Sequence, residues 1–221
     1  MNKLIFAIIL SLPNLYGQEK SSNSKQNTKD RSISMVEVKI DNLIFDCRVA
    51  GISNEGDGVI LLHGFPETSH MWVELMMLLS SKGFRVIAPD QRGYSLGARP
   101  TKSSDYKFEN LVNDVFAMAD SFRFEQFHLV GHDWGASIGW GMVAHSPDRV
   151  LSWTAMSVPH LKAFGQALKT DDDQKTKSRY FGFFKLPFIP ELYFSFNNHQ
   201  NLKNIWNQST AEEIDAYLQV F

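Results

Sequence analysis

Apolar and polar residues alternate along residues 36–40 and again along residues 43–49. A period of two is typical of strands with one buried face, and the intervening Asp41-Asn42 is typical of a tight turn. The sequence therefore predicts a β-hairpin here. Residues 58–62 form a continuous apolar run instead, which indicates a strand buried on both faces of a sheet. A second buried strand is predicted over residues 84–88 and a short, mainly apolar strand over residues 127–130.

Helical spacing of apolar residues separates these predicted strands. A first helix is predicted to begin at Thr68 or Ser69 and to end before Gly83. Its predicted buried side carries Trp72, Leu75, Met76 and Leu79. A second helix is predicted over residues 108–122, with a buried side that carries Leu111, Val115, Met118 and Phe122.

A third helix is predicted from residue 134 to Ser146, and Pro147 closes it before a strand over residues 150–156. Strands and helices thus alternate along the chain. This order predicts the α/β class, with a doubly wound and mostly parallel sheet.

Beyond His160 the strand pattern stops. Aromatic residues gather over residues 180–196, and we expect this segment to cover the apolar mouth of the sheet. The acidic run at residues 171–173 indicates the solvated start of a helix rather than a metal site, because no histidine lies near it. We therefore expect a core domain over residues 35–159 and a cap domain over residues 160–221.

The end of the chain predicts one more helix. Ser209 and Glu212 have the spacing of a capping box. The apolar positions after them keep helical spacing up to the last residue: Ile214, Tyr217, Leu218 and Phe221. We interpret this unfinished pattern as a chain truncated within the cap.

The first residues are expected to be a targeting signal rather than part of the folded domain. Lys3 precedes an apolar run over residues 4–12, and Gly17 supplies a small residue at the expected cleavage point. We therefore predict a signal peptide over residues 1–17 and export of the protein. The polar residues 18–34 are expected to form a disordered linker. The nine-residue apolar run is too short for a stable membrane span.

Composition narrows the possible partners. The formal net charge is −2 and no basic stripe is present, which argues against binding to nucleic acid. The single cysteine, Cys47, lies in a predicted strand and is expected to be buried there. The sequence has no metal-ligand cluster at the usual spacing and no phosphate-binding glycine loop, so it implies no cofactor or metal. The oligomeric state is left open.

Candidate chemistry centres on Gly131-His-Asp-Trp-Gly135. This segment joins a predicted strand to a predicted helix in the frame of the nucleophile elbow, with Asp133 at the position where serine is usual. The alternative interpretation is a glycine-bearing turn in which Asp133 only caps the helix. Two further motifs follow predicted strands: His63-Gly-Phe-Pro-Glu67 and Asp90-Gln-Arg-Gly-Tyr-Ser95. Parallel sheets bind ligands at these strand ends.

Together the three motifs resemble the α/β-hydrolase fold, and within it the epoxide hydrolases that use an aspartate nucleophile. The resemblance covers residues 36–221 and implies an α/β sheet with a helical cap. It implies that Asp133 attacks an epoxide carbon and forms an ester, which water then hydrolyses to give a diol. A carboxylate suits this task because its ester with a saturated carbon is stable, whereas attack on a carbonyl would give an anhydride.

The resemblance also assigns roles around Asp133. The backbone N–H groups of Phe65 and Trp134 are expected to hold the oxyanion. Tyr180, or alternatively Tyr193, is expected to protonate the opening epoxide from the cap. Further residues are expected around a small apolar substrate: His63, Gly64, Pro66, Glu67 and Trp134.

Some of these residues also have a structural interpretation. The His63 side chain is typical of a hydrogen-bonded residue in a tight turn. Glu67 is expected either to begin a helix or to orient water. Arg92, in the loop that follows the predicted strand over residues 84–88, is expected to form an ion pair or to cap.

Two other functions stay open at this point. Haloalkane dehalogenases are related to the same branch, and Trp134 would suit halide binding. A non-catalytic, exported protein that binds small apolar molecules would also fit. In the family, the catalytic acid and histidine follow the cap. His145, His160 and His199 do not match that order, so we expect the remaining strands to be missing, turnover to be low or absent and the chain to be of poor stability.

Overall fold

The computed structural model describes residues 32–221. The predicted signal peptide, and the predicted linker up to residue 31, lie outside the described residues. The first strand begins at Ser34, so the last residue of the predicted linker belongs to the sheet instead.

The described strands form one six-stranded sheet in the order β1-β2-β4-β3-β5-β6. β1 and β2 are the predicted hairpin, and β2 pairs antiparallel with β4. The remaining neighbours pair in parallel, as the alternation of strands and helices predicts. The strand bounds are β1 Ser34–Ile40, β2 Leu43–Ala50, β3 Gly58–Leu62, β4 Arg85–Pro89, β5 Phe127–His132 and β6 Val150–Met156.

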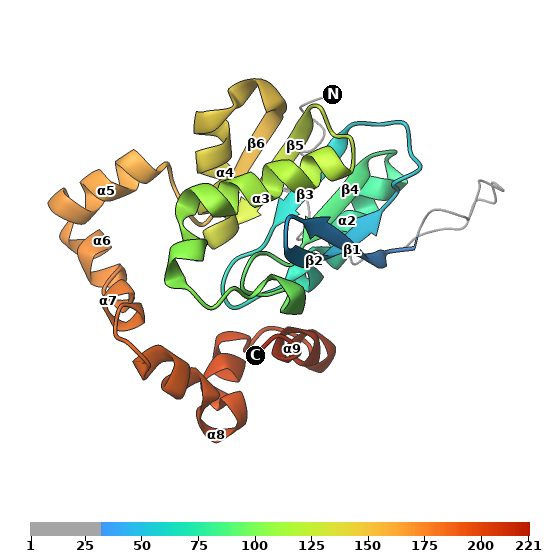
Figure 1. Ribbon diagram of the computed structural model, residues 1–221. Helices are drawn as coiled ribbons and strands as arrows, with labels where there is room; N and C mark the ends of the chain where they lie inside the picture. Colours follow the sequence, from blue (N-terminus) through green and yellow to red (C-terminus); the bar gives the residue numbers. More distant parts are fainter. Residues whose placement is uncertain (1–31) are drawn as a thin grey trace, which may run out of the picture.

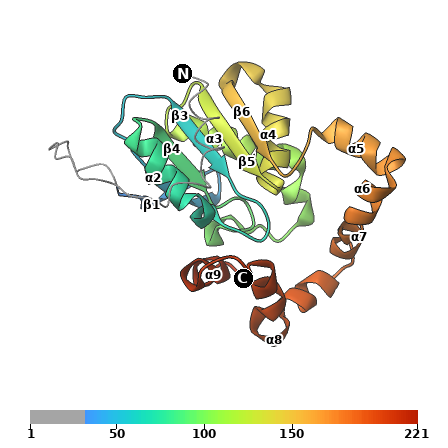
Figure 2. The same ribbon diagram turned by 180° about the vertical axis from the view of Figure 1, so that it is seen from behind.

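Helices cover both faces of this sheet (Figures 1 and 2). On β3 the side chains alternate, so that Ile60 and Leu62 pack with α3 and α4, whereas Val59 and Leu61 pack with α2 on the opposite face. These strand residues are fully buried, which confirms a strand buried on both faces. The helix bounds are α2 Val73–Ser81, α3 Phe108–Ser121 and α4 Trp134–His145, with short 3₁₀ helices at η3 Ser69–Trp72, η4 Leu96–Ala98, η5 Ser103–Tyr106 and η6 Pro147–Arg149.

After β6 the described chain is helical. In Figure 1 helices α5 to α8 extend away from the sheet as an arm, and α9 returns below the strand ends. Trp206 and Tyr217 are buried together there, packed against Phe65 and Met71 of the core. The bounds are α5 Leu161–Thr170, α6 Asp172–Lys177, α7 Tyr180–Phe184, α8 Ile189–Ile205 and α9 Ala211–Leu218.

The structure corrects several local predictions. The capping box of the last helix is formed by Thr210 and Glu213, one residue later than predicted. Thr68 caps the 3₁₀ helix η3, and α2 begins only at Val73. On α3 the buried side also includes Asp114, which the apolar spacing did not suggest.

Two further local expectations, the burial of Cys47 and the helix start at the acidic run, are met. Cys47 is a free and fully buried strand residue, and burial raises the pKa of its thiol. Asp171 caps α6 by accepting hydrogen bonds from the N–H groups of Asp173 and Gln174, as expected of a solvated helix start. Over residues 32–221, no helix combines the length and the apolar character needed to cross a bilayer. The same residues contain no group of three or more potential metal ligands.

Candidate active site

The turn between β5 and α4 places Asp133 in a strained conformation, with φ of 51° and ψ of −115°. Such a backbone costs about 1–3 kcal/mol and persists only where the surroundings enforce it. The flanking glycines permit it, because a Cβ on Gly135 would lie 2.3 Å from the carbonyl oxygen of Leu62. A Cβ on Gly131 would lie 2.5 Å from the carbonyl oxygen of Gly135. The local geometry is therefore that of a sharp strand-to-helix elbow.

The Asp133 side chain does not cap the helix that follows it. Asp133 occupies the N-cap position of α4, but its carboxylate accepts no hydrogen bond from that helix. Its Oδ1 instead accepts a hydrogen bond of 3.0 Å from the backbone N–H of Phe65. The chain passes so close that a Cβ on Gly64 would lie 2.4 Å from the Cβ of Asp133. The helix-capping interpretation is therefore wrong for this residue.

His63 holds the loop that carries the Phe65 N–H. The ring is fully buried, with Nδ1 3.0 Å from the Gly64 oxygen and Nε2 accepting a hydrogen bond of 3.1 Å from the N–H of Gln91. Burial lowers the pKa of this imidazole, so it is neutral, with its proton on Nδ1. His63 thus ties the loop after β3 to the loop after β4, as the tight-turn interpretation suggested.

The loop after β4 is held by its own polar contacts. Asp90 accepts a hydrogen bond of 2.6 Å from the N–H of Ser69. Arg92 donates two hydrogen bonds of 2.7 Å to the two carboxylate oxygens of Asp114 on α3. These contacts confirm that Arg92 is paired, and they explain why Asp114 is buried on the apolar side of its helix.

A histidine and a carboxylate also meet beside Asp133. The Nδ1 atom of His132 lies 3.2 Å from Oε2 of Glu67, an ion-pair distance, although the angle departs from that of a well-formed hydrogen bond. Contact with the Glu67 carboxylate raises the pKa of His132 above its ordinary value, in opposition to burial. Glu67 lies before the cap of η3, so it does not begin a helix as expected.

This ion pair predicts a pH-dependent effect of Glu67→Gln. The raised pKa means that the pair stabilises the fold fully below pH of about 6.5, the ordinary histidine value, and that this stability is lost as the pH rises through the folded pKa. We expect the variant to unfold about 1 kcal/mol more easily at pH 6 and to match the wild type at high pH. Urea unfolding at several pH values measures this difference.

Glu74→Gln on α2 is the matched control, because Glu74 is exposed and forms no ion pair with residues 32–221. An NMR titration of the His132 ring should give a lower pKa in Glu67→Gln and an unchanged pKa in Glu74→Gln. An unchanged His132 pKa in Glu67→Gln would contradict the assignment of the ion pair.

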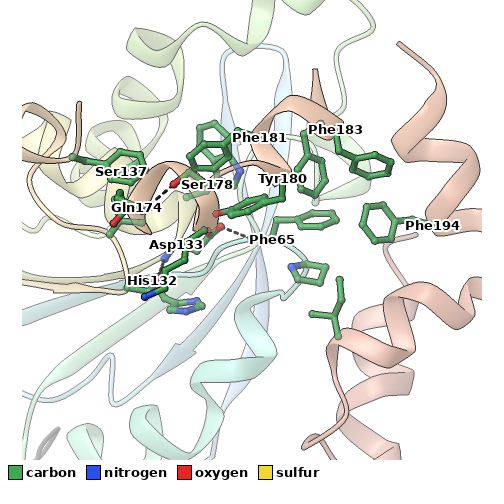
Figure 3. Close-up of a pocket in the computed structure, with 18 of the residues that line it drawn as sticks. Phe65, His132, Asp133, Ser137, Gln174, Ser178, Tyr180, Phe181, Phe183 and Phe194 are labelled. Atoms are coloured by element: carbon green, nitrogen blue, oxygen red, sulfur yellow. Dashed lines mark hydrogen bonds between the residues drawn. The ribbon is translucent and has the colours of Figure 1, made fainter. Parts of the chain in front are cut away.

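Asp133 opens into a cavity of about 1360 Å³ between the strand ends and helices α5 to α8. Figure 3 shows the Tyr180 side chain between Asp133 and Phe65, with its hydroxyl directed toward the carboxylate. Partial burial and the nearby Asp133 charge raise the pKa of Tyr180. Tyr193 also lines the cavity, and aromatic rings make up much of its surface.

The structure brings some of the predicted residues together and leaves others apart. Five of them line the cavity: Phe65, Pro66, Asp133, Trp134 and Tyr180. Trp134 is the first residue of α4, so its N–H has no acceptor within the helix. His63, Gly64 and Glu67 do not line the cavity. They contact the residues and loops that form it, as described above.

The other histidines considered from the sequence lie away from Asp133. His160 caps α5 by accepting a hydrogen bond from the N–H of Lys162. His145 contacts Ser146 at the end of α4, and His199 lies at a kink within α8. None of the three lines the cavity.

His132 is the site residue that the sequence interpretation missed. A signal was present, because His132 ends β5 and Glu67 follows β3, and these strands are parallel neighbours. Residues at the carboxyl ends of neighbouring parallel strands meet at one edge of the sheet. Pairing the two motifs by strand order would have brought the two side chains together.

Comparison with known proteins identifies a matching family and similar relatives. A family model described as alpha/beta hydrolase fold matches residues 58–203. The AB hydrolase superfamily protein YfhM of Bacillus subtilis is 31% identical over 173 residues, which are 76% of this chain. Human epoxide hydrolase 4 is 33% identical over 174 residues, which are 74% of this chain.

Solved structures give a similar picture. A Bacillus megaterium epoxide hydrolase in complex with an inhibitor superposes with a TM-score of 0.78 and 26% identity, over 84% of this chain and 66% of that one. The matched regions span 60% of the Bacillus subtilis protein and 48% of the human protein. The chain thus corresponds to about half of the length of these relatives.

Proposed function

The chain belongs to the α/β-hydrolase fold family, and on this basis we propose that it acts on epoxides through a covalent ester of Asp133. The observation that carries the proposal is the position of this carboxylate. It stands at a strained elbow, faces an apolar cavity and has Oδ1 bonded to the Phe65 N–H. Oδ2 has no hydrogen-bond partner among the described residues and is the oxygen free to attack.

In the first step, Asp133 attacks the epoxide and a phenol of the cap supplies the proton. A bond forms between Oδ2 of Asp133 and an epoxide carbon, while the bond from that carbon to the epoxide oxygen breaks. The released alkoxide takes a proton from a phenol of the cap. Tyr180 suits this role, because its raised pKa keeps it protonated at neutral pH and its hydroxyl is directed toward Asp133.

The second step needs donors for an oxyanion. When water attacks the ester carbonyl carbon of Asp133, negative charge develops on Oδ1. Collapse of this intermediate breaks the Cγ–Oδ2 bond and releases the diol; one proton of the water goes to the departing diol oxygen, and the other restores the phenol of the cap. The Phe65 N–H is already 3.0 Å from this atom, and the Trp134 N–H is free of helix bonding at the start of α4. The Phe65 N–H is fixed by the backbone and needs no rearrangement to serve there.

Incubation of the 221-residue chain with styrene oxide tests the proposal. We expect an intact-mass increase of one styrene oxide, mapped to the peptide that contains Asp133, or diol formation where hydrolysis follows. Absence of both products would contradict the proposal. Saturable binding of styrene oxide without either product would favour a non-catalytic binding protein.

Dehalogenation is distinguished by a parallel incubation with 1-bromobutane. Halide release, without an adduct or a diol from styrene oxide, would favour it. Phe65 offers only its backbone N–H beside the nucleophile, and that donor is bonded to Asp133, which favours the epoxide reaction.

A further inference from the structure

The cavity beside Asp133 has two walls of different chemistry. The aromatic wall is a continuous cluster of rings, in which the Phe65 centroid lies 5.4 Å from Phe184 and 5.5 Å from Phe194. Phe183 and Tyr193 extend this cluster. In Figure 3 the labelled rings of Phe65, Phe183 and Phe194 lie on one side of Asp133.

The polar wall lies on the other side of Asp133 in the same view and consists of Ser137, Gln174 and Ser178 (Figure 3). Gln174 Nε2 donates a hydrogen bond of 2.9 Å to Ser178 Oγ across one turn at the end of α6. Ser137 lies one turn after Asp133 on α4, and its N–H donates to the Asp133 carbonyl oxygen at 3.0 Å. Both elements thus place polar side chains on the cavity.

The polar wall keeps unused hydrogen-bonding capacity. Within residues 32–221, the Gln174 Oε1 atom accepts no hydrogen bond, and the hydroxyls of Ser137 and Ser178 donate none. Ser178 is only 8% exposed, so its hydroxyl has little solvent other than that in the cavity. An acceptor and two donors are therefore available side by side to a bound molecule.

Three other polar side chains around the cavity already have partners among residues 32–221. Asn201 donates to the carbonyl oxygen of Tyr193, and Asn204 accepts from Gln200. The Lys177 ammonium is paired with Asp173 at 2.7 Å and is mostly exposed. The polar wall therefore differs from these three residues, because it combines an unused acceptor with two hydroxyls that donate no hydrogen bond.

We propose that the polar wall selects hydroxy-epoxides, which carry an aryl or alkyl group on one ring carbon and a hydroxymethyl group on the other. This inference rests on the proposed epoxide reaction and names its substrate class. The apolar group packs on the aromatic wall. The substrate hydroxyl donates to Gln174 Oε1 and accepts from Ser178 or Ser137. An ether oxygen can only accept, so an alcohol uses the wall more fully.

Two epoxides that differ by one hydroxyl test the proposal: 3-phenylglycidol and trans-β-methylstyrene oxide. Epoxide consumption by stoichiometric protein is followed, because it includes both ester and diol. We expect 3-phenylglycidol to react about tenfold faster than its methyl analogue, as one to two additional net hydrogen bonds allow. The double variant Gln174→Leu/Ser178→Ala should lose this preference, so that the two epoxides react at similar rates.

Thr176→Val is the matched control, because Thr176 lies on α6 with its hydroxyl bonded to Asp172 and does not line the cavity. It should keep the preference. Ser178→Ala alone, a smaller change, should reduce the preference in part. The ratio of the two rates is compared between variants, so that the intrinsic reactivity of the epoxides cancels.

The outcomes separate this inference from the function on which it rests. Equal ratios in the wild type and the double variant would overturn the hydroxyl selection while leaving the epoxide reaction intact. Failure of both epoxides to react, with styrene oxide also inert, would remove the proposed function and the inference together.

Discussion

Replacement of Asp133 by asparagine is expected to reduce ester formation with styrene oxide by about 10³-fold or more, because the amide is a far weaker nucleophile than the carboxylate. The substitution is close in size, so the close packing of Gly64 against the side chain at position 133 is kept. The amide oxygen can still accept the hydrogen bond from the Phe65 N–H. Intact mass after a timed incubation measures the effect.

The fold should survive this change. We expect the urea midpoint of Asp133→Asn to match that of the wild type or to rise slightly, since the strained elbow no longer holds a charge. Undiminished ester or diol formation in a folded Asp133→Asn variant would show that another residue attacks, and would end the case for this mechanism.

Gly64→Ala is expected to have the second largest effect. The added Cβ would lie 2.4 Å from the Cβ of Asp133 and 2.6 Å from its Oδ1, so the carboxylate must move. Overpacking of this kind costs about 1–3 kcal/mol of stability. A displacement of about 1 Å at the reacting atom can also reduce the rate of ester formation about 10²-fold. Urea unfolding and timed intact mass measure the two effects.

Gly165→Ala is the matched control, because nothing lies within 4 Å of the added Cβ on α5. In a helix interior this change should stabilise slightly, by up to about 1 kcal/mol, and leave ester formation unchanged. Equal rates for Gly64→Ala and the wild type would contradict the close approach between the two loops.

The sequence was sufficient where a local pattern determines the structure. The hairpin, β3 and β6 follow from apolar periodicity, and the elbow follows from Gly131 and Gly135 on either side of its sharp turn. The link between Phe65 and Asp133 was expected only through the resemblance, and in the structure it is a hydrogen bond of 3.0 Å.

The sequence alone was insufficient where two alternative local structures fit the same pattern. Ser209 with Glu212 and Thr210 with Glu213 have the same spacing, and both satisfy the capping-box pattern. The structure uses the second pair, with Thr210 N and Oγ1 both contacting Glu213. The helix that this pair caps buries Tyr217 with Trp206, a contact outside the capping box that no local pattern records.

Long-range pairing explains the remaining failures. The contact between Glu67 and His132 joins residues that are far apart in sequence, and neither side chain has a local signature. The burial of Asp114 on α3 was not predicted for the same reason, because its partner Arg92 lies on the loop after β4. The two walls of the cavity likewise come from different elements, and only the folded arm sets them on opposite sides of Asp133.

The hydrogen bond from the Phe65 N–H makes the two oxygens of Asp133 inequivalent before any ligand binds. One oxygen is held and its charge partly neutralised, while the other keeps its lone pairs exposed to the cavity. In the proposed ester, Oδ1 would therefore become the carbonyl oxygen and Oδ2 the bridging oxygen. A single backbone amide, placed by the fold, would thus decide which atom of a symmetric carboxylate becomes attached to carbon.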